Sequence, residues 1–416
     1  MMKKLITLTI FVCAFTLVSA QPLLSTGGKR MPTEWIDSAT GHRIVRLSDR
    51  ERGSNLSFYF HNNPFVGERM VYYGSERIDL TGVSKQEISS GNARNRQIHL
   101  MDLKTRTSET LTRHEQPMNG EIVHAPSGRI FYQIRDTIFE LDIRTRSPRK
   151  VHVFDQDYRG SVSTVNADGT MLAGTRSSDA ERELFRKNPD KSSYFNVIYE
   201  AKLPRTIFTI DITTGKRTDR LTDTAWLNHL QFSPFDPDLL MFCHEGPWHK
   251  VDRIHTLKIS TGQQRIVHHR SMPMEIAGHE WFSHDGKTIW FDLQQPRSVT
   301  FFVCGADVET GIERKYKLKR DEWSIHFNLS NDQRLFCGDG GDPGQVARAK
   351  DGRWIYLFHP EGDSLRSQRL VDMTHHNYRL EPNVHFSPDD RWVIFRANFE
   401  GIEQIYAVDI RKNIKR

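Results

Sequence analysis

The sequence has little cysteine to hold it together. Four cysteines occur in 416 residues, and one of them, Cys13, lies in an N-terminal apolar stretch. The other three, Cys243, Cys304 and Cys337, cannot all pair, and each lies in or at the end of an apolar, strand-like run. We therefore expect buried thiols rather than a disulfide framework.

Long apolar runs are also lacking beyond the first residues. Residues 1–20 contain two lysines, an apolar run over residues 5–18 and a small-residue pair, which is the pattern of a secretory signal peptide. No later stretch approaches the roughly 20 apolar residues that a membrane span needs. We predict no membrane span, a mature chain over residues 21–416, and export, with the periplasm as the destination.

Several catalytic and nucleotide-binding motifs are missing. The sequence has no Gly-x-Ser-x-Gly elbow, no His-Glu-x-x-His, no phosphate-cradling glycine loop and no Cys-x-x-Cys pair. Its formal net charge of +6 and pI of about 9.0 suit an acidic partner, but charge alone does not separate a polyanionic sugar from nucleic acid. The sequence carries no signal for an oligomeric state.

What the sequence does contain is a repeated unit. A strand, most often ending in Asp, runs into a short turn and a further strand, and seven copies begin at Ile98, Ile138, Ile207, Ile254, Phe302, Trp354 and Ile405. A second motif precedes each copy and places a tip such as Ser-His-Asp-Gly or Ser-Pro-Asp-Asp between two apolar runs. Such tips are typical of hairpins, so each repeat predicts four antiparallel strands, which is a propeller blade.

The two ends of the chain predict how the ring closes. The segment 34–48 resembles the outer-strand segment 210–222 but has no inner strands of its own. We predict an all-β, seven-bladed β-propeller in a single domain over residues 21–416, closed by an N-terminal outer strand that completes the last blade. The polar insertions Ser75–Arg96 and Ser177–Pro204 are expected to form surface loops or lids.

Four residues occupy equivalent places in successive repeats. Four positions before the Ser of the turn motif stand His229, His279, His326 and Asn383, and His61 or Asn62 takes this place in the first blade. Inner strands begin beside the central channel, so these side chains should converge there. A single such histidine is explained by packing, whereas several in register favour a functional pocket.

Arginines follow the second strands of several blades, and the topology brings these loops to the same mouth of the channel. They include Arg176, Arg253 and Arg396, and Arg253 belongs to the segment Cys243–Arg253. Forked guanidinium groups hold carboxylates in two-point contact. Imidazoles ringed by arginines therefore predict a site for an anion.

Some segments resemble the oligogalacturonate lyase family over nearly the whole mature chain. The resemblance rests on the segments Trp226–Pro234, Phe242–Trp248, Gly278–Glu280 and Leu335–Gly340, and it is most specific at Cys-His-Glu-Gly-Pro. It implies β-elimination on short galacturonate chains, which leaves a 4,5-unsaturated end, and a divalent metal, most often manganese. The expected partner is an acidic oligosaccharide and not nucleic acid.

The resemblance also implies roles for individual residues. His244 would be the base, with Arg253 as a second catalytic residue, and His279 would bind the metal. Further metal ligands come from Glu381, Asn383 and His385, where this chain departs from the family pattern. Independently of the resemblance, the places of Arg176, His229, His326 and Arg396 in the repeats predict substrate-binding residues. Mixed nitrogen and oxygen ligands suit manganese.

Two other readings of the sequence remain. The first is a non-catalytic periplasmic propeller that acts as a binding or scaffold module, because the Ser-Pro-Asp turn recurs in such proteins. It predicts no tightly bound metal and no unsaturated product. The second is the propeller half of a serine peptidase, but seven blades use the whole chain and leave no room for a hydrolase domain.

Overall fold

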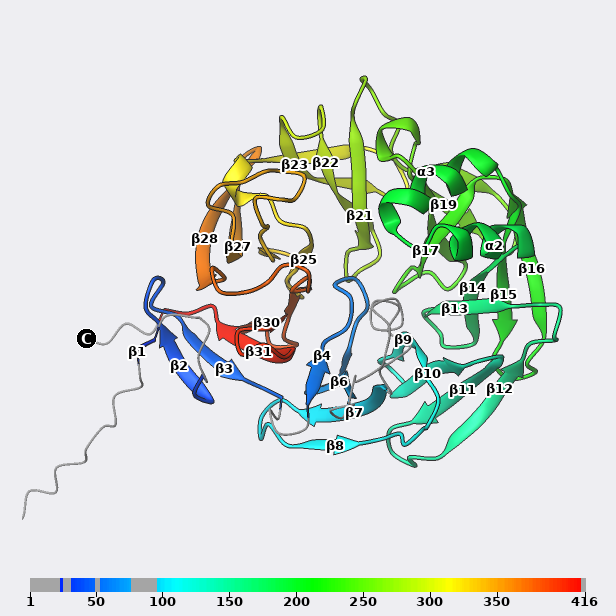
Figure 1. Ribbon diagram of the computed structural model, residues 1–416, viewed down its shortest axis with the longest axis horizontal. Coiled ribbons are helices and arrows are strands. Elements are labelled where there is room, and N and C mark those ends of the chain that lie inside the picture. The colour runs from blue at the N-terminus through cyan, green and yellow to red at the C-terminus, as the bar shows by residue number, and fades with distance from the viewer. Residues whose placement is uncertain (1–22, 25–30, 49–52, 76–95, 413–416) are drawn as a thin grey trace, which may run out of the picture.

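The computed structural model describes residues 23–24, 31–48, 53–75 and 96–412. The predicted signal peptide and most of the insertion Ser75–Arg96 lie outside these residues. Within them the strands form a ring of seven blades around a central channel, each built on four strands, with β5 added to the first blade and β1 and β2 added to the last (Figure 1). This confirms the predicted seven-bladed β-propeller.

The first four blades follow each other along the chain, each running from its inner to its outer strand. Blade 1 holds β4 (Ser54–Leu56), β6 (Arg69–Ser75) with β5 (Phe65–Val66) beside it, β7 (Arg96–Asp102) and β8 (Ser108–Thr110). Blade 2 holds β9 (Asn119–His124), β10 (Arg129–Ile134), β11 (Thr137–Asp142) and β12 (Pro148–Val153). Blade 3 holds β13 (Gly160–Val165), β14 (Met171–Ser177), β15 (Arg205–Asp211) and β16 (Arg217–Asp223). Blade 4 holds β17 (Trp226–Phe232), β18 (Leu239–Glu245), β19 (Ile254–Lys258) and β20 (Gln264–Ile266).

The last three blades complete the ring. Blade 5 holds β21 (Ile276–Phe282), β22 (Thr288–Gln294), β23 (Phe301–Asp307) and β24 (Glu313–Leu318). Blade 6 holds β25 (Phe327–Leu329), β26 (Phe336–Gly338), β27 (Trp354–Glu361) and β28 (Ser364–Asp372), and one bridge between β24 and β28 joins it to blade 5. Blade 7 holds β29 (His385–Phe386), β30 (Trp392–Ala397) and β31 (Gln404–Asp409), followed by N-terminal strands β3 (Arg43–Arg46), β2 (Glu34–Asp37) and β1 (Leu23–Leu24).

The closure of the ring is as predicted. Strand β3 pairs antiparallel with β31, with Ile44 opposite Val408, so the N-terminal segment supplies the fourth strand of blade 7. Trp35 on β2 is fully buried and meets the ring of Tyr406 edge-on. The described parts of the two ends are therefore joined through one sheet and one apolar contact, which pairs the edge of β31 at the seam.

Side-chain hydrogen bonds explain why the two repeated motifs form turns. At the outer turn of blade 3, the carboxylate of Asp211 accepts from the backbone N–H of Thr214 at 2.7 Å, and Gly215 adopts the left-handed conformation that the turn requires. At the inner turn of blade 5, the hydroxyl of Ser283 accepts from the N–H of Thr288 at 3.0 Å. Each repeat thus carries its own hairpin chemistry.

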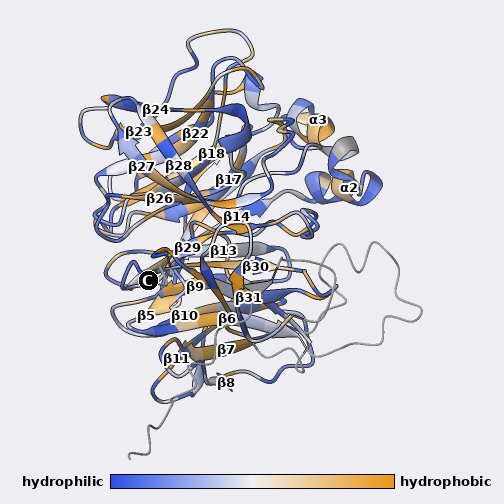
Figure 2. Cartoon of the chain, turned by 90° about the vertical axis from the view of Figure 1, so that its left-hand side faces the viewer, coloured by the Kyte–Doolittle hydropathy of each residue, from blue (hydrophilic) through white to orange (hydrophobic). Residues whose placement is uncertain are grey.

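The insertion Ser177–Pro204 folds as two short helices, α2 (Asp179–Lys187) and α3 (Lys191–Ala201), rather than as an irregular loop. They lie on one side of the ring (Figure 2). Phe185, Tyr194 and Phe195 pack their rings against Trp226 at the start of blade 4. Among the described residues no helix is long and apolar enough to cross a bilayer.

The blades pack on each other through clusters of buried apolar side chains, and many of the strands in Figure 2 carry the orange of hydrophobic residues. Cys243, Cys304 and Cys337 are free and buried, as predicted. A short 3-10 helix, η2 (Trp248–Lys250), lies in the loop after β18, and a second, η3 (Arg320–Glu322), precedes blade 6.

Candidate active site

Bulges in the inner strands aim the channel residues. The pairing of β17 with β18 breaks between Asn228 and Gln231, and that of β21 with β22 breaks between Gly278 and Trp281. At these breaks His229 and His279 adopt positive φ angles of 47° and 48°, and Asn383 in blade 7 has a φ of 51°. Non-glycine residues rarely adopt this conformation, and bulges of this kind re-aim side chains next to functional sites.

Two of the channel histidines are held by buried carboxylates. The Nδ1 of His279 lies 3.0 Å from Asp292, and the Nδ1 of His326 lies 2.8 Å from Asp339. The two imidazole rings meet edge-to-face with their centroids 4.9 Å apart. A carboxylate on Nδ1 fixes the orientation and tautomer of the ring and leaves Nε2 for chemistry, as at metal sites and in catalytic triads.

The two histidines differ in their electrostatic surroundings. Burial lowers the pKa of His326 well below its usual value and raises that of Asp339 to about 7, so His326 is neutral near neutral pH. For His279 burial acts in the same direction, but the charge and hydrogen bond of Asp292 outweigh it and raise the pKa. His279 is therefore the more basic of the pair.

Oxygen atoms lie beside His326. Its Nε2 is 3.2 Å from the hydroxyl of Tyr59 and 3.8 Å from a carboxylate oxygen of Glu381, whose side chain is 44% exposed. A neutral imidazole and a carboxylate are suitable ligands for a manganese-like cation, which accepts both nitrogen and oxygen donors. His326 and Glu381, with Asp339 behind the imidazole, thus fit a divalent metal.

A buried ion network borders the histidines on the blade 4 side. Arg253 lies between Glu245, at 2.7 Å, and Glu280, at 3.1 Å, and its side chain is only 2% exposed. The indole N–H of Trp248 donates to Glu245 at 2.9 Å, and its ring lies edge-on to His279. Glu245 is also 3.4 Å from Nε2 of His229.

Glycine permits this close packing. A Cβ on Gly278 would overlap the ring of Trp248, and one on Gly246, whose φ is 146°, would overlap the ring of Tyr199. The glycines of the two segments that resemble the lyase family therefore allow the loop after β18 to lie against blade 5 and against helix α3.

Several residues predicted for the site lie elsewhere or have other partners. His244 points to the opposite face of β18 from Glu245, because side chains alternate along a strand, and it stacks on His255 with ring centroids 3.8 Å apart. The assignment of His244 as the base stays a prediction, and the structure places this side chain against His255, away from Glu245 and Arg253. Arg253 is enclosed by carboxylates and does not present its guanidinium at the rim.

The last blade likewise departs from the expected ligand set. The side-chain oxygen of Asn383 accepts from the N–H of Phe60 at 3.0 Å, and its amide donates to the carbonyl of Glu381. His385 faces the carbonyl oxygen of Asn62 through Nε2, at 3.2 Å. Only Glu381 of these three presents its side chain to the neighbouring histidine, at the 3.8 Å given above.

The guanidinium groups of the two predicted substrate arginines already donate some of their hydrogen bonds to backbone carbonyls. Arg396 donates to the backbone carbonyls of Glu381 and Ser57, at 2.7 and 3.0 Å. Arg176 stacks on Tyr158 at the end of β14, and it donates to a backbone carbonyl at 3.3 Å. Both lie at the mouth towards which β14 and β30 run.

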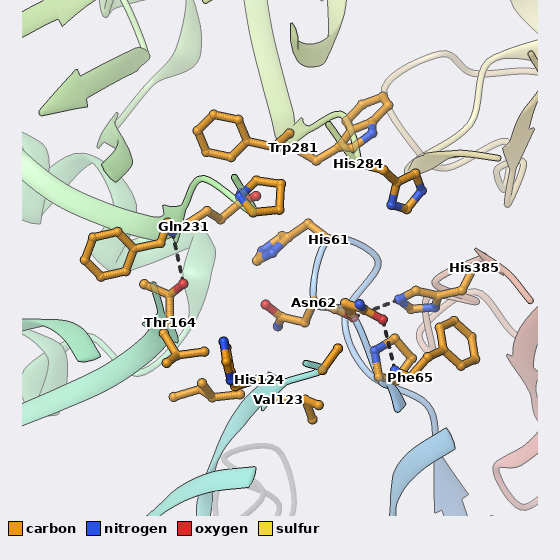
Figure 3. A pocket seen from close by; sticks show the side chains of 18 of the residues that line it. His61, Asn62, Phe65, Val123, His124, Thr164, Gln231, Trp281, His284 and His385 are labelled. Carbon is orange, nitrogen blue, oxygen red and sulfur yellow. Dashed lines mark hydrogen bonds between the residues drawn. The ribbon is translucent and has the colours of Figure 1, made fainter. Parts of the chain in front are cut away.

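A separate cavity of about 480 Å³ opens at the other end of the channel (Figure 3). Its walls come from the carboxyl ends of the inner strands, including His124, Gln231 and His284. His61 and Asn62 reach into the middle of it, and His385 faces them from one side (Figure 3). His61 thus lines this cavity, and Tyr59 lies between it and His326.

Sequence reasoning assigned no role to Asp292, Glu280 or Tyr59, although Glu280 lies in a segment that carries the family resemblance. One signal could have found Asp292. In the hairpin of β21 and β22, Gly278 pairs with Asp292, so a buried Asp in the second strand stands next to the bulged His279.

Fold and site together define a propeller enzyme with carboxylate-held imidazoles in its channel. Over residues 28–414 the chain matches the family model described as oligogalacturonate lyase, and it belongs to that family. This confirms the resemblance seen in the sequence and the prediction of a lyase that acts on pectin fragments. It does not favour a non-catalytic scaffold.

Curated relatives and solved structures agree with this assignment. The oligogalacturonate lyase of Dickeya dadantii is 23% identical over 400 residues, covering 91% of this chain and 96% of that protein. The oligogalacturonide lyase of Pectobacterium atrosepticum is 22% identical over 399 residues, with the same coverage. A solved oligogalacturonate lyase in complex with manganese superposes with a TM-score of 0.75 at 21% identity, covering 94% of this chain and 99% of that one. One from Vibrio parahaemolyticus gives 0.73 at 22%, covering 92% and 97%.

Proposed function

We propose that the protein cleaves short oligogalacturonates by β-elimination at the mouth of the channel where His279 and His326 meet, with the help of a bound divalent cation. The observation that carries this proposal is the pair of imidazoles whose Nδ1 atoms are anchored by Asp292 and Asp339. His326 suits metal binding and His279 suits proton removal. A β-elimination beside a carboxylate needs both functions.

His326 and Glu381 would hold the metal. Manganese is the proposed ion, because the donors are nitrogen and oxygen and because a structural relative is in complex with it. When bound, the ion would pair with the substrate carboxylate and lower the pKa of the adjacent C5–H. Asn383 and His385 join the ligand set only if they exchange their present partners.

His279 is the proposed base, in place of His244. Its Nε2 is directed away from Asp292, and its ring lies between the Arg253 network and His326. In the reaction Nε2 removes the proton from C5, the C–H electrons form the C4–C5 double bond, and the C4–O bond to the next sugar breaks. Asp292 stabilises the imidazolium that results.

The arginines contribute in two ways. Arg253 supplies a fixed positive charge beneath the site and keeps Glu245 and Glu280 in place. Arg176 and Arg396, nearer the rim, are proposed to attract substrate carboxylates.

We also propose that residues 1–20 direct export to the periplasm, which cell fractionation with and without these residues would test.

One experiment addresses the metal, the base and the reaction together. The protein is stripped with a chelator, a manganese salt is added, and the ultraviolet absorbance of the unsaturated product is followed with digalacturonate as substrate. We expect turnover only with metal, and His326→Ala should lose both bound metal, measured by elemental analysis, and turnover. His279→Ala should keep the metal and lose turnover, and His152→Gln on the outer strand β12 serves as the control.

Metal-dependent turnover that survives in His326→Ala would remove His326 from the ligand set. Loss of metal in His279→Ala would return His279 to the ligand role predicted from the sequence. Absence of any unsaturated product with wild-type protein and metal would refute the proposed function.

A further inference from the structure

A second group of metal-ligating side chains lies in blade 4. It consists of His229 on β17 and of Cys243 and Glu245 on β18, and one ligand atom from each lies within 4.8 Å of the other two. The proposed manganese site uses none of these three residues. An imidazole, a thiol and a carboxylate are the kinds of side chain that bind zinc in proteins.

Strand geometry brings the three side chains together. Cys243 and Glu245 are two positions apart on β18, so they project from the same face of the sheet, whereas His244 between them projects from the other. Cys243 lies opposite Asn228 in the hairpin, directly before the bulge that holds His229 at a φ of 47°. At this bulge the imidazole lies against Glu245, with Nε2 3.4 Å from Oε2. The group is thus fixed by the pairing of two neighbouring strands.

The distances suit a tetrahedral ion. Arg253 and the indole N–H of Trp248 both donate to Oε1 of Glu245, whereas Oε2 faces His229 and has no other partner among the described residues. Two nitrogen or oxygen ligands bound at about 2.1 Å to a tetrahedral ion lie about 3.4 Å apart, which matches the separation of Nε2 and Oε2. A thiolate ligand lies about 3.6 Å from the other two, so Sγ of Cys243 has to approach them by at most about 1.2 Å.

The charge of the surrounding network favours a cation at this place. Burial acts to raise the pKa values of Glu245 and Glu280, but the charge of Arg253 and hydrogen bonds outweigh it and lower both. Two carboxylates against the single guanidinium of Arg253 leave one buried negative charge, which is costly. Burial raises the pKa of the Cys243 thiol well above its usual value, so the thiol by itself adds no charge. A dication that takes the place of the thiol proton adds one positive charge and cancels the excess.

We propose that His229, Cys243 and Glu245 form a binding site for a thiophilic dication such as zinc, separate from the manganese site. On binding, the thiol proton leaves to solvent, and the ion bonds to Nε2, Sγ and Oε2 with its fourth position open to water. Manganese prefers oxygen and nitrogen donors, so it does not compete for the thiolate. The side chain of His229 is 32% exposed and provides the way in for the ion. This inference does not depend on the proposed reaction.

Cobalt(II) is the probe for the thiolate, because it occupies zinc sites and gives a sulfur-to-metal charge-transfer band in the near ultraviolet only when a thiolate binds it. The protein is stripped with a chelator and loaded with cobalt or zinc, and bound metal is measured by elemental analysis. We expect the band in the wild type, and in Cys243→Ser no band and one zinc ion fewer per chain. Cys304→Ser and Cys337→Ser change the other two buried thiols, and as matched controls they should keep the band.

A second variant separates binding from folding. His229 is partly exposed, so His229→Gln should keep the melting temperature of the wild type without metal. Loss of a group that only orients a ligand costs about 10–100-fold in metal affinity, so loss of the imidazole itself should weaken cobalt binding by at least about 10²-fold.

Three results would overturn the proposal. The wild type could show no charge-transfer band, the band could survive in Cys243→Ser or stay at full affinity in His229→Gln, or it could disappear in Cys304→Ser, which would move the ion to the thiol near Glu313. All these readouts are taken without substrate, so a failure of the proposed lyase reaction is measured separately and leaves them unchanged.

Discussion

Replacing Asp292 by Asn tests how the structure activates His279. The carboxylate of Asp292 lies 3.0 Å from Nδ1 and its side chain is only 1% exposed, so water cannot replace it. Its other oxygen, Oδ2, is buried without a hydrogen-bond partner among the described residues. An Asn side chain fits the same space but brings no charge.

The expected loss follows from the strength of this contact. A hydrogen bond to a charged partner contributes about 1.5–3 kcal/mol. At about 1.4 kcal/mol for each factor of ten in rate, the imidazolium that forms in the transition state loses roughly 10–150-fold. If the amide turns its NH₂ to Nδ1, the proton moves to Nε2 and the base is blocked altogether. We therefore expect kcat to fall by at least about 10-fold in Asp292→Asn.

The assay is the rate of unsaturated product from digalacturonate at saturating manganese, recorded over a range of pH. Because Asp292 raises the pKa of His279 against the effect of burial, the acid limb of kcat/KM should move to lower pH in the variant. Bound metal should be unchanged. A variant within about threefold of wild type would refute both the role of Asp292 and His279 as base.

Three further predictions concern the base, the ring closure and a buried ion pair. His244→Ala should keep kcat within a few fold of wild type, because this side chain stacks on His255 on the opposite face of β18 from Glu245; a loss like that of His279→Ala would contradict the new base assignment. Trp35→Ala should lower the free energy of unfolding by about 3–5 kcal/mol in urea titrations, whereas Ile312→Ala, 71% exposed, should change it little. Burial acts to lower the pKa of His268, but Glu313 and Glu275 outweigh it and raise the pKa, so its imidazolium stabilises the fold below the unfolded pKa of about 6.5 and this stabilisation is lost as pH rises through the folded pKa. The melting temperature of His268→Gln should therefore fall further below wild type at about pH 6 than at about pH 8, and an equal deficit at both would refute the linkage.

The sequence by itself determined the blades and their order. Turn residues such as Asp211 and Ser283 act within a few positions of themselves, so their pattern is readable without a structure. The same local logic placed His229, His279 and Asn383 at equivalent positions in their repeats, and the structure finds all three at positive φ. The pairing of the N-terminal strand with blade 7 followed because only one repeat lacked an outer strand.

Only the tertiary structure decided which side chains meet in the channel. Along β18 neighbouring side chains point to opposite faces of the sheet, so a register shift of one residue would exchange His244 and Glu245. In the structure Glu245, rather than His244, faces Arg253. Asp292 and His279 are brought together by strand pairing across a bulge. Each of these contacts depends on the register of neighbouring strands and blades, and that register is set by packing over long sequence distances, which no local motif contains.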